Sequence, residues 1–188
     1  MKSDTIAAIA TALSDAGIGI IRISGPEAIA VANRVVVNKK KEHTLKNWQT
    51  HTIHYGFVEE NGTILDEVMV SVMKAPRSYT TEDTVEINCH GGVLLTKRVL
   101  EAVLHAGARM AEPGEFTKRA FLSGRIDLSE AEAVMDLIQA KNQFSMQASI
   151  KQLRGSVAEK VKSLRAALLY EIAFIESALD DPEPVSYT

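Results

Sequence analysis

A charged segment at residues 112–128 divides this chain into two parts, and it reads Glu112-Pro113-Gly114-Glu115-Phe116-Thr117-Lys118-Arg119-Ala120-Phe121-Leu122-Ser123-Gly124-Arg125-Ile126-Asp127-Leu128. Strand-like sequence precedes this segment and strongly helical sequence follows it. Pro113-Gly114 indicates a turn, and Glu115, Lys118 and Arg119 place charges at helical spacing around Phe116, Ala120 and Phe121. We therefore expect a short helix that ends at Gly124. A junction of this kind can hold a functional site or an interface, or it can be a plain turn between two domains.

The composition is that of a globular protein. Apolar residues make up 46% of the chain and charged residues 24%, so a core can form and disorder is not expected. The net charge of -3 gives no general affinity for nucleic acid. The single cysteine, Cys89, excludes an internal disulfide framework and fits a reducing cytoplasm. The sequence has no apolar run of membrane-spanning length and no signal-peptide pattern, so we expect a soluble cytoplasmic protein.

The first part of the chain, residues 1–120, alternates strand-like and helix-like segments. Extended segments are predicted at residues 5–10, 18–24, 52–58, 64–72, 84–89 and 109–111. Asn61-Gly62 between two of these segments indicates a β-hairpin. Helical patterns follow Pro26 and the turn His90-Gly91-Gly92. This mixture predicts an α+β domain.

The second part, residues 121–188, contains only helical patterns. Asp127 and Ser129 offer two capping-box starts, each with a glutamate three positions on, at Glu130 and Glu132. From about Gln143, apolar residues recur at steps of three and four as far as Leu179, which predicts one helix of about 35 residues that ends at Asp181-Pro182. The surrounding chain is too short to cover this apolar stripe. A partner is therefore implied, and it is the first domain, a second copy, or sequence that this chain lacks.

Four kinds of functional site can be assessed from the residues alone: a reactive thiol, a metal site, an anion-binding turn and a P-loop. Cys89 and His90 are neighbours on a strand and point to opposite faces, which argues against a thiol–imidazole pair. The five histidines show no metal-ligand spacing, so we assign no metal site, and we assign no catalytic residue. The amides of the His90-Gly91-Gly92 turn can hold an anion or simply form a tight turn. The chain contains no Gly-Lys dipeptide, and hence no phosphate-binding P-loop.

Three charged residues form the candidate ligand-binding set. Arg22 lies in a glycine-flanked strand, Glu86 projects from the polar face of another strand, and Arg125 lies in the junction. Taken singly, each is an ordinary surface charge. If they converge, a carboxylate between two cations suits a ligand that has a donor-rich heterocycle and an anionic tail.

Three ordered blocks of this sequence resemble the N-terminal part of the tRNA modification GTPase family MnmE, also called TrmE. The blocks are Gly19-Ile20-Ile21-Arg22-Ile23-Ser24-Gly25, then Glu82-Asp83-Thr84-Val85-Glu86-Ile87 with Cys89-His90-Gly91-Gly92, and then residues 113–122, 124–128 and 131–133 of the junction. The resemblance covers nearly the whole chain in the right order.

The resemblance implies an N-terminal domain similar in fold to tetrahydrofolate-dependent aminomethyltransferases. Such a domain binds 5-formyltetrahydrofolate or a related tetrahydrofolate as the one-carbon donor, and it forms a homodimer. By motif, the folate-contacting residues of the family fall on Arg22, Glu86 and Arg125. Residues 121–188 would be the first part of the helical domain. In the full-length family, a GTPase that uses GTP, Mg and K acts with the flavoprotein MnmG on C5 of the wobble uridine (U34) of tRNA.

This chain contains neither the GTP-binding motifs nor the C-terminal cysteine motif of that family. We therefore expect a part that binds folate and dimerises and that does not hydrolyse GTP alone. The alternative hypothesis is a ligand-free homodimeric interaction module whose long apolar stripe docks partner helices. A third possibility is a free-standing one-carbon transfer enzyme, for which the sequence shows no obvious second substrate site.

Overall fold

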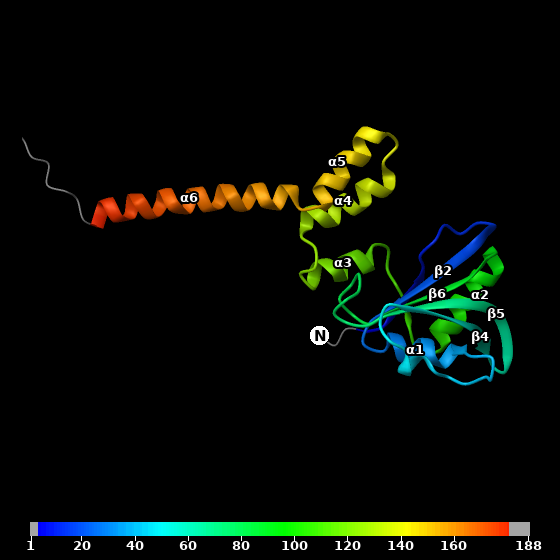
Figure 1. Ribbon diagram of the computed structural model, residues 1–188. Helices are drawn as coiled ribbons and strands as arrows, with labels where there is room; N and C mark the ends of the chain where they lie inside the picture. Colours follow the sequence, from blue (N-terminus) through cyan, green and yellow to red (C-terminus); the bar gives the residue numbers. More distant parts are fainter. Residues whose placement is uncertain (1–3, 181–188) are drawn as a thin grey trace, which may run out of the picture. The chain divides into compact units, whose positions relative to one another are not determined.

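The computed structural model describes residues 4–180, and the chain divides into two compact units, Met1–Arg125 and Ile126–Thr188 (Figure 1). The division falls after Arg125, so the junction helix α3 (Glu115–Leu122) lies wholly within the first unit. The first unit is a mixed sheet with helices and the second is all helix. This arrangement confirms the predicted α+β fold class followed by an all-α segment.

One sheet forms the centre of the first unit. Within residues 4–180 its strands are β1 (Ile6–Ile9), β2 (Ala16–Ser24), β3 (Val36–Val37), β4 (Thr52–Glu60), β5 (Thr63–Met73), β6 (Thr84–Gly91) and β7 (Arg109–Met110). Their order across the sheet is β3-β4-β5-β6-β2-β1-β7. Neighbouring strands are antiparallel except for the parallel pair β1 and β7. The Asn61-Gly62 turn joins β4 and β5 with positive φ at both residues, which confirms the predicted hairpin.

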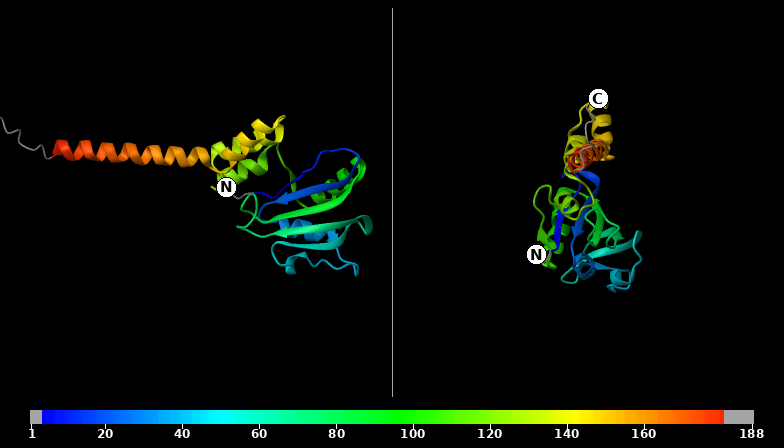
Figure 2. Two further views of the ribbon diagram at one scale, coloured as in Figure 1. Left: turned by 45° about the horizontal axis from the view of Figure 1, so that its top comes forward. Right: turned by 90° about the vertical axis from the view of Figure 1, so that its left-hand side faces the viewer.

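Two helices cover the same face of this sheet. They are α1 (Ala28–Val35) and α2 (Val93–His105), and both pack on the central strands (Figure 2). Alternate strand residues point toward these helices and are buried there, among them Ile21, Val70 and Ile87. A short 3-10 helix, η1 (Leu45–Asn47), adds the buried Leu45 to the same core. The residues in between point to the opposite face of the sheet, which neither α1 nor α2 covers.

Strands β2 and β6 approach closely at Gly91, and this contact leads to a first prediction. A Cβ atom on Gly91 would lie against the backbone carbonyl of Ala16, closer than atoms can approach without a shift of the strand. We expect Gly91→Ala to lower the free energy of unfolding by about 2 kcal/mol, because backbone must move to admit the methyl group. The midpoint of chemical unfolding measures this effect.

The neighbouring Gly92 supplies the matched control. It caps the N-terminus of α2 with a φ of -65°, and a Cβ atom there would meet nothing within 4 Å. Gly92→Ala should therefore cost no more than about 0.5 kcal/mol, the usual penalty for a poorer cap. Equal losses of unfolding free energy in the two variants would show that the contact with the Ala16 carbonyl does not cause the destabilisation by Gly91→Ala.

The second unit begins with a helical hairpin. It consists of α4 (Leu128–Gln139) and α5 (Gln143–Leu153), followed by α6 (Ser156–Asp180). The Asp127 carboxylate accepts a hydrogen bond from the Glu130 amide at 2.8 Å, and Glu130 accepts one from the Asp127 amide at 2.7 Å. Of the two predicted capping-box starts, the structure confirms Asp127 with Glu130 and places Ser129 inside the helix. Within residues 4–180 no helix combines the length and the apolar character needed to cross a membrane.

The prediction of one helix from Gln143 onward is wrong. The helix is interrupted at Arg154 and Gly155, where Gly155 takes a left-handed φ of +79°. Glycine adopts this conformation without the steric cost that a Cβ atom brings, so it ends α5 and allows α6 to start in a new direction. The apolar spacing continues through the interruption and therefore did not reveal it. The expected helix end at Asp181-Pro182 lies outside the described residues.

Candidate functional site

The open face of the sheet carries an ion pair between β2 and β6. Arg22 and Glu86 lie directly opposite each other in the strand ladder, and the Arg22 Nε donates to the Glu86 Oε1 at 2.7 Å. The side chains are 32% and 22% exposed. Among residues 4–180, neither the terminal nitrogens of Arg22 nor the Oε2 of Glu86 takes part in a further hydrogen bond. The pair therefore retains the two terminal nitrogens of Arg22 as donors and the Oε2 of Glu86 as an acceptor for a ligand.

Helix α3 brings an aromatic ring to this pair. The Arg22 guanidinium lies 5.6 Å from the centroid of the Phe116 ring, within the range of a cation–π contact. The turn before the helix places Gly114 at a left-handed φ of +76°, as the Pro113-Gly114 signal predicts. Beyond the helix, Gly124 takes a φ of +74° and donates to the Phe121 carbonyl at 2.9 Å. The predicted short helix is thus confirmed at both ends.

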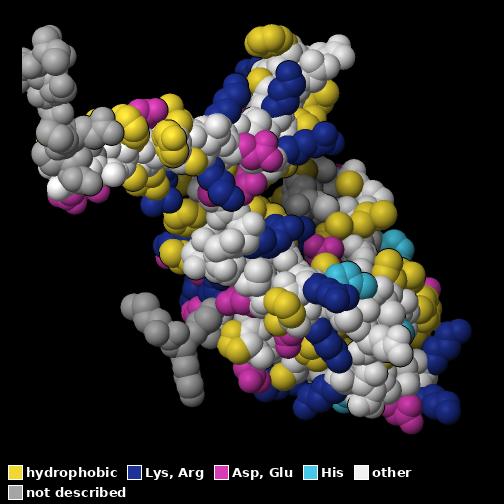
Figure 3. Space-filling view, turned by 60° about the vertical axis from the view of Figure 1, so that its left-hand side comes forward, with side chains coloured by type: hydrophobic (Ala, Val, Ile, Leu, Met, Phe, Trp, Pro, Cys, Tyr) yellow, Lys and Arg dark blue, Asp and Glu magenta, His cyan; other side chains and the backbone are white. Residues whose placement is uncertain are grey.

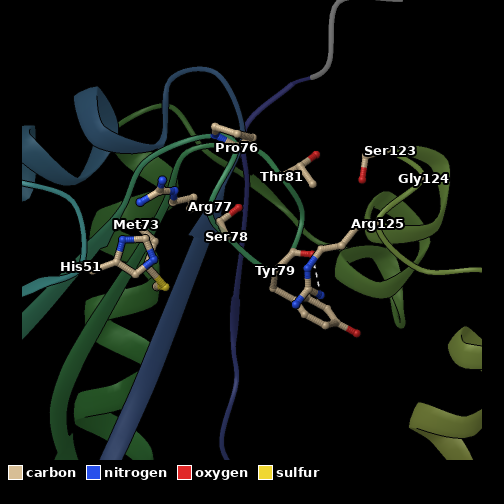
Figure 4. A pocket seen from close by; sticks show the side chains of 10 residues that line it. All are labelled: His51, Met73, Pro76, Arg77, Ser78, Tyr79, Thr81, Ser123, Gly124 and Arg125. Atoms are coloured by element: carbon tan, nitrogen blue, oxygen red, sulfur yellow. Dashed lines mark hydrogen bonds between the residues drawn. The ribbon is translucent and has the colours of Figure 1, made fainter. Parts of the chain in front are cut away.

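Arg125 does not join the pair. Its guanidinium lies 5.0 Å from the centroid of the Tyr79 ring and donates to the Tyr79 carbonyl at 3.3 Å (Figure 4). Two side chains that were not predicted connect Arg125 to the Arg22–Glu86 pair. The Tyr79 hydroxyl hydrogen-bonds to Thr117 at 3.0 Å, and Thr117 follows Phe116 in the chain. Of the three predicted site residues, the structure brings two together and places the third along the edge of a cavity.

This cavity has a volume of about 630 Å³ and lies at one end of the open sheet face. Its lining residues are His51, Met73, Pro76, Arg77, Ser78, Tyr79, Thr81, Ser123, Gly124 and Arg125 (Figure 4). Met73 lies two residues beyond Ser71 on β5, and Ser71 is directly opposite Glu86 in the ladder. Two residues of a strand span about 7 Å, so the edge of the cavity at Met73 is one side-chain position along the open face from the Arg22–Glu86 pair.

A charge network holds α3 in place. Glu115 accepts hydrogen bonds from Arg109 at 2.7 Å and from Arg119 at 3.0 Å, and both arginines also bind Asp4. Arg119 reaches Glu82 as well, at 3.1 Å. The Arg109 guanidinium, helped by Arg119, lowers the pKa of Glu115 to about 2 despite the opposing effect of burial. The same two guanidinium groups lower the pKa of Asp4 to about 2.

This network was not anticipated from the sequence. The only local signal is the four-residue spacing of Glu115 and Arg119, which fits an ion pair on a helix. Asp4 and Glu82 are distant in the chain, and no spacing rule connects them to α3. The consequence for the site is positional, because the network fixes the helix that carries Phe116 and Thr117.

Cys89 and His90 take separate environments, as their positions on the strand predict. The Cys89 thiol is buried in the core, which raises its pKa, and it donates to the Gly19 carbonyl at 3.3 Å. His90 is exposed on the other face, and its ring lies 2.8 Å from the Asp66 carboxylate, which raises the histidine pKa. Over residues 4–180 no three His, Cys, Asp or Glu side chains are grouped as metal ligands would be.

The fold and the site define a class: a two-unit protein in which an α+β domain with a charged, open sheet face precedes a helical segment. Two family models match it in this order. The model described as "GTP-binding protein TrmE N-terminus" matches residues 5–125, and the model described as "MnmE helical domain" matches residues 128–187. The chain belongs to the family of the tRNA modification GTPase MnmE.

Individual relatives agree with this assignment. The tRNA modification GTPase MnmE of Lachnoclostridium phytofermentans is 59% identical over 186 residues, which cover 99% of this chain and 41% of the relative. The protein of the same name from Listeria welshimeri is 52% identical over 97% of this chain and 39% of its own length. That of Carboxydothermus hydrogenoformans is 51% identical over 97% of this chain and 40% of its own. The chain thus spans about two fifths of the length of the curated relatives it matches.

Proposed function

We propose that this chain is the folate-binding and dimerising part of a protein that modifies tRNA. The observation that carries the proposal is the Arg22–Glu86 pair, which two strands present on an open sheet face beside an aromatic ring. The family resemblance assigns folate contacts to these two residues. The ligand would be 5-formyltetrahydrofolate or a related tetrahydrofolate that supplies one carbon.

The chemistry of the pair suits a pterin. The heterocycle presents an amino group and a ring N–H side by side, and a carboxylate such as that of Glu86 can accept both. Arg22 holds Glu86 in position through Nε and still has free donors. The Phe116 ring offers an apolar surface next to the pair. Arg125, at the cavity edge, would meet the anionic end of the ligand, because a guanidinium suits a carboxylate.

The open sheet face also supports dimerisation of the first unit. Ile53, Tyr55 and Met69 point to this face from β4 and β5, and they are between 42% and 62% exposed. Large apolar side chains that are exposed together favour an interface. We propose that a second copy of the chain covers them, which would place the folate site at or near the dimer contact.

For the whole protein we propose the activity that the relatives' name states, a tRNA modification GTPase. In that context GTP, Mg and K would serve the GTPase part, and the flavoprotein MnmG would act with it on C5 of U34 in the cytoplasm. This chain has no Gly-Lys dipeptide and hence no P-loop. Its own contribution would therefore be the folate site and the dimer contact, and it would not hydrolyse GTP alone.

Calorimetric titration of 5-formyltetrahydrofolate into the purified chain, with the mass in solution determined on the same sample, tests this function. We expect saturable binding near one ligand per protomer of a dimer. Folded protein that binds no folate under these conditions would contradict the folate assignment. A monomeric mass at the concentration of the titration would contradict the dimer assignment.

A second candidate function rests on the second unit. Along α6 the apolar side chains Val161, Leu164, Leu168, Ile172 and Ile175 are at least half exposed, and hydrophobic side chains show at the surface of this unit (Figure 3). This favours an interaction module that docks partner helices. We expect a chain that ends after Arg125 to remain dimeric if the first unit supplies the main contact. A monomeric mass for that shorter chain would favour the interaction module.

A further inference from the structure

The arginines of the first unit fall into two groups. Arg22, Arg98, Arg109 and Arg119 pair with carboxylates, and Arg34 donates to the Ala106 carbonyl. Arg77 and Arg125 pair with no carboxylate among residues 4–180. Both of these arginines line the 630 Å³ cavity, where Arg125 donates to the Tyr79 carbonyl. A guanidinium without a carboxylate partner retains its capacity to bind an anion.

The cavity as a whole is suited to anions. Its lining contains two arginines and one histidine and no aspartate or glutamate. Arg77 comes from the loop after β5 and Arg125 from the turn after α3, so the two charges have separate origins in the chain. Figure 4 shows Arg77 and His51 on one side of the cavity and Arg125 with Tyr79 on the other, with Ser78 between them. Charges that are spread in this way suit several anionic groups on a flexible chain better than one compact anion.

The position of the cavity relates it to the proposed folate site. It begins one row of the sheet away from the Arg22–Glu86 pair, on the same open face. A ligand whose heterocycle lies on that pair can therefore extend its tail into the cavity. The tail of a folate is glutamate, and each further glutamate in the tail adds one carboxylate.

We propose that this cavity binds the glutamate tail and makes the protein selective for folates that carry several glutamates. The proposal rests on the proposed folate function and adds the form of folate that the site takes. Arg125 receives the first tail carboxylates, as in the proposed function, and Arg77, on the opposite side of the cavity, receives the later ones. The attraction between exposed charges is screened by salt, so the selectivity declines as ionic strength rises.

The test compares 5-formyltetrahydrofolate with its triglutamate form by calorimetric titration at low salt. We expect the triglutamate to bind about tenfold more tightly to the full chain, the size expected for one or two partly exposed charge contacts. In Arg77→Gln this advantage should fall to about twofold, while affinity for the monoglutamate changes by less than about twofold. Lys40→Gln removes the same charge from an exposed loop outside the cavity and should leave both affinities unchanged.

The outcomes separate the two proposals. Equal affinity for the two forms, or an advantage that survives Arg77→Gln, overturns the tail site and leaves the folate function standing. Folded protein that binds neither form overturns both proposals. A short single-stranded RNA serves as the second probe. If this RNA competes with the triglutamate, and the triglutamate binds no more tightly than the monoglutamate, the cavity binds phosphates and the tail site is overturned.

Discussion

Glu86→Ala should reduce the affinity for 5-formyltetrahydrofolate by about 100-fold, because the variant loses a carboxylate that makes charged hydrogen bonds to the ligand. The fold should survive the change. The Arg22–Glu86 pair is partly exposed, so its loss should alter the free energy of unfolding by no more than about 1 kcal/mol. Titration calorimetry measures the affinity, and the thermal unfolding midpoint of the same sample checks the fold.

Glu101→Ala is the matched control for this loss. Glu101 lies on α2, which covers the other face of the sheet, and its side chain is 52% exposed. It is not part of the Arg22–Glu86 pair or of the open face, so its removal should leave folate affinity within about twofold of the parent chain. If Glu86→Ala binds folate as tightly as the parent chain, the assignment of Glu86 to the site is wrong.

Glu115→Ala should destabilise the first unit by about 3 kcal/mol, because Arg109 and Arg119 lose the more buried of the two carboxylates that they share and keep in common only the exposed Asp4. The Glu115 side chain is 10% exposed and that of Arg119 is 11% exposed, so water compensates little for the loss. Glu112→Ala removes an exposed carboxylate from the same turn, and it should change the free energy of unfolding by less than about 0.5 kcal/mol. Chemical unfolding at neutral pH measures both variants. Equal effects would show that the network does not stabilise α3.

The same network predicts how stability depends on pH. The folded-state pKa of Glu115 is about 2, and the ordinary value is 4.5, so the stabilisation is fully present above about pH 4.5. It is lost as the pH falls from 4.5 toward 2, and the loss amounts to about 3 kcal/mol. In Glu115→Gln this part of the pH dependence should disappear. Unfolding free energies measured at steps between pH 7 and pH 2.5 test this, and an unchanged slope in the variant would contradict it.

Local features of the sequence predicted most of the elements. Alternation along residues 84–89 predicts the face from which Glu86 projects, because successive side chains of a strand point in opposite directions. The Asn61-Gly62 hairpin and the Asp127 capping box follow from conformations that particular residue types favour. The interruption of the long helix at Gly155 was not predicted, because the apolar spacing continues through it. One residue in the left-handed region is enough to end a helix, and a periodic pattern does not register it.

The amino-acid sequence by itself determined the α+β class, the two-part organisation and the resemblance that singles out Arg22, Glu86 and Arg125. These follow from residue spacing, turn chemistry and ordered motifs, all of which are local along the chain. Only the tertiary structure decided that Arg22 meets Glu86, that Arg125 lies instead on Tyr79 beside a cavity, and that Asp4 and Glu82 help hold α3. Arg119 is 115 residues from Asp4 and 37 from Glu82. Such contacts depend on strand register and helix packing, which bring distant residues together and which no local pattern encodes.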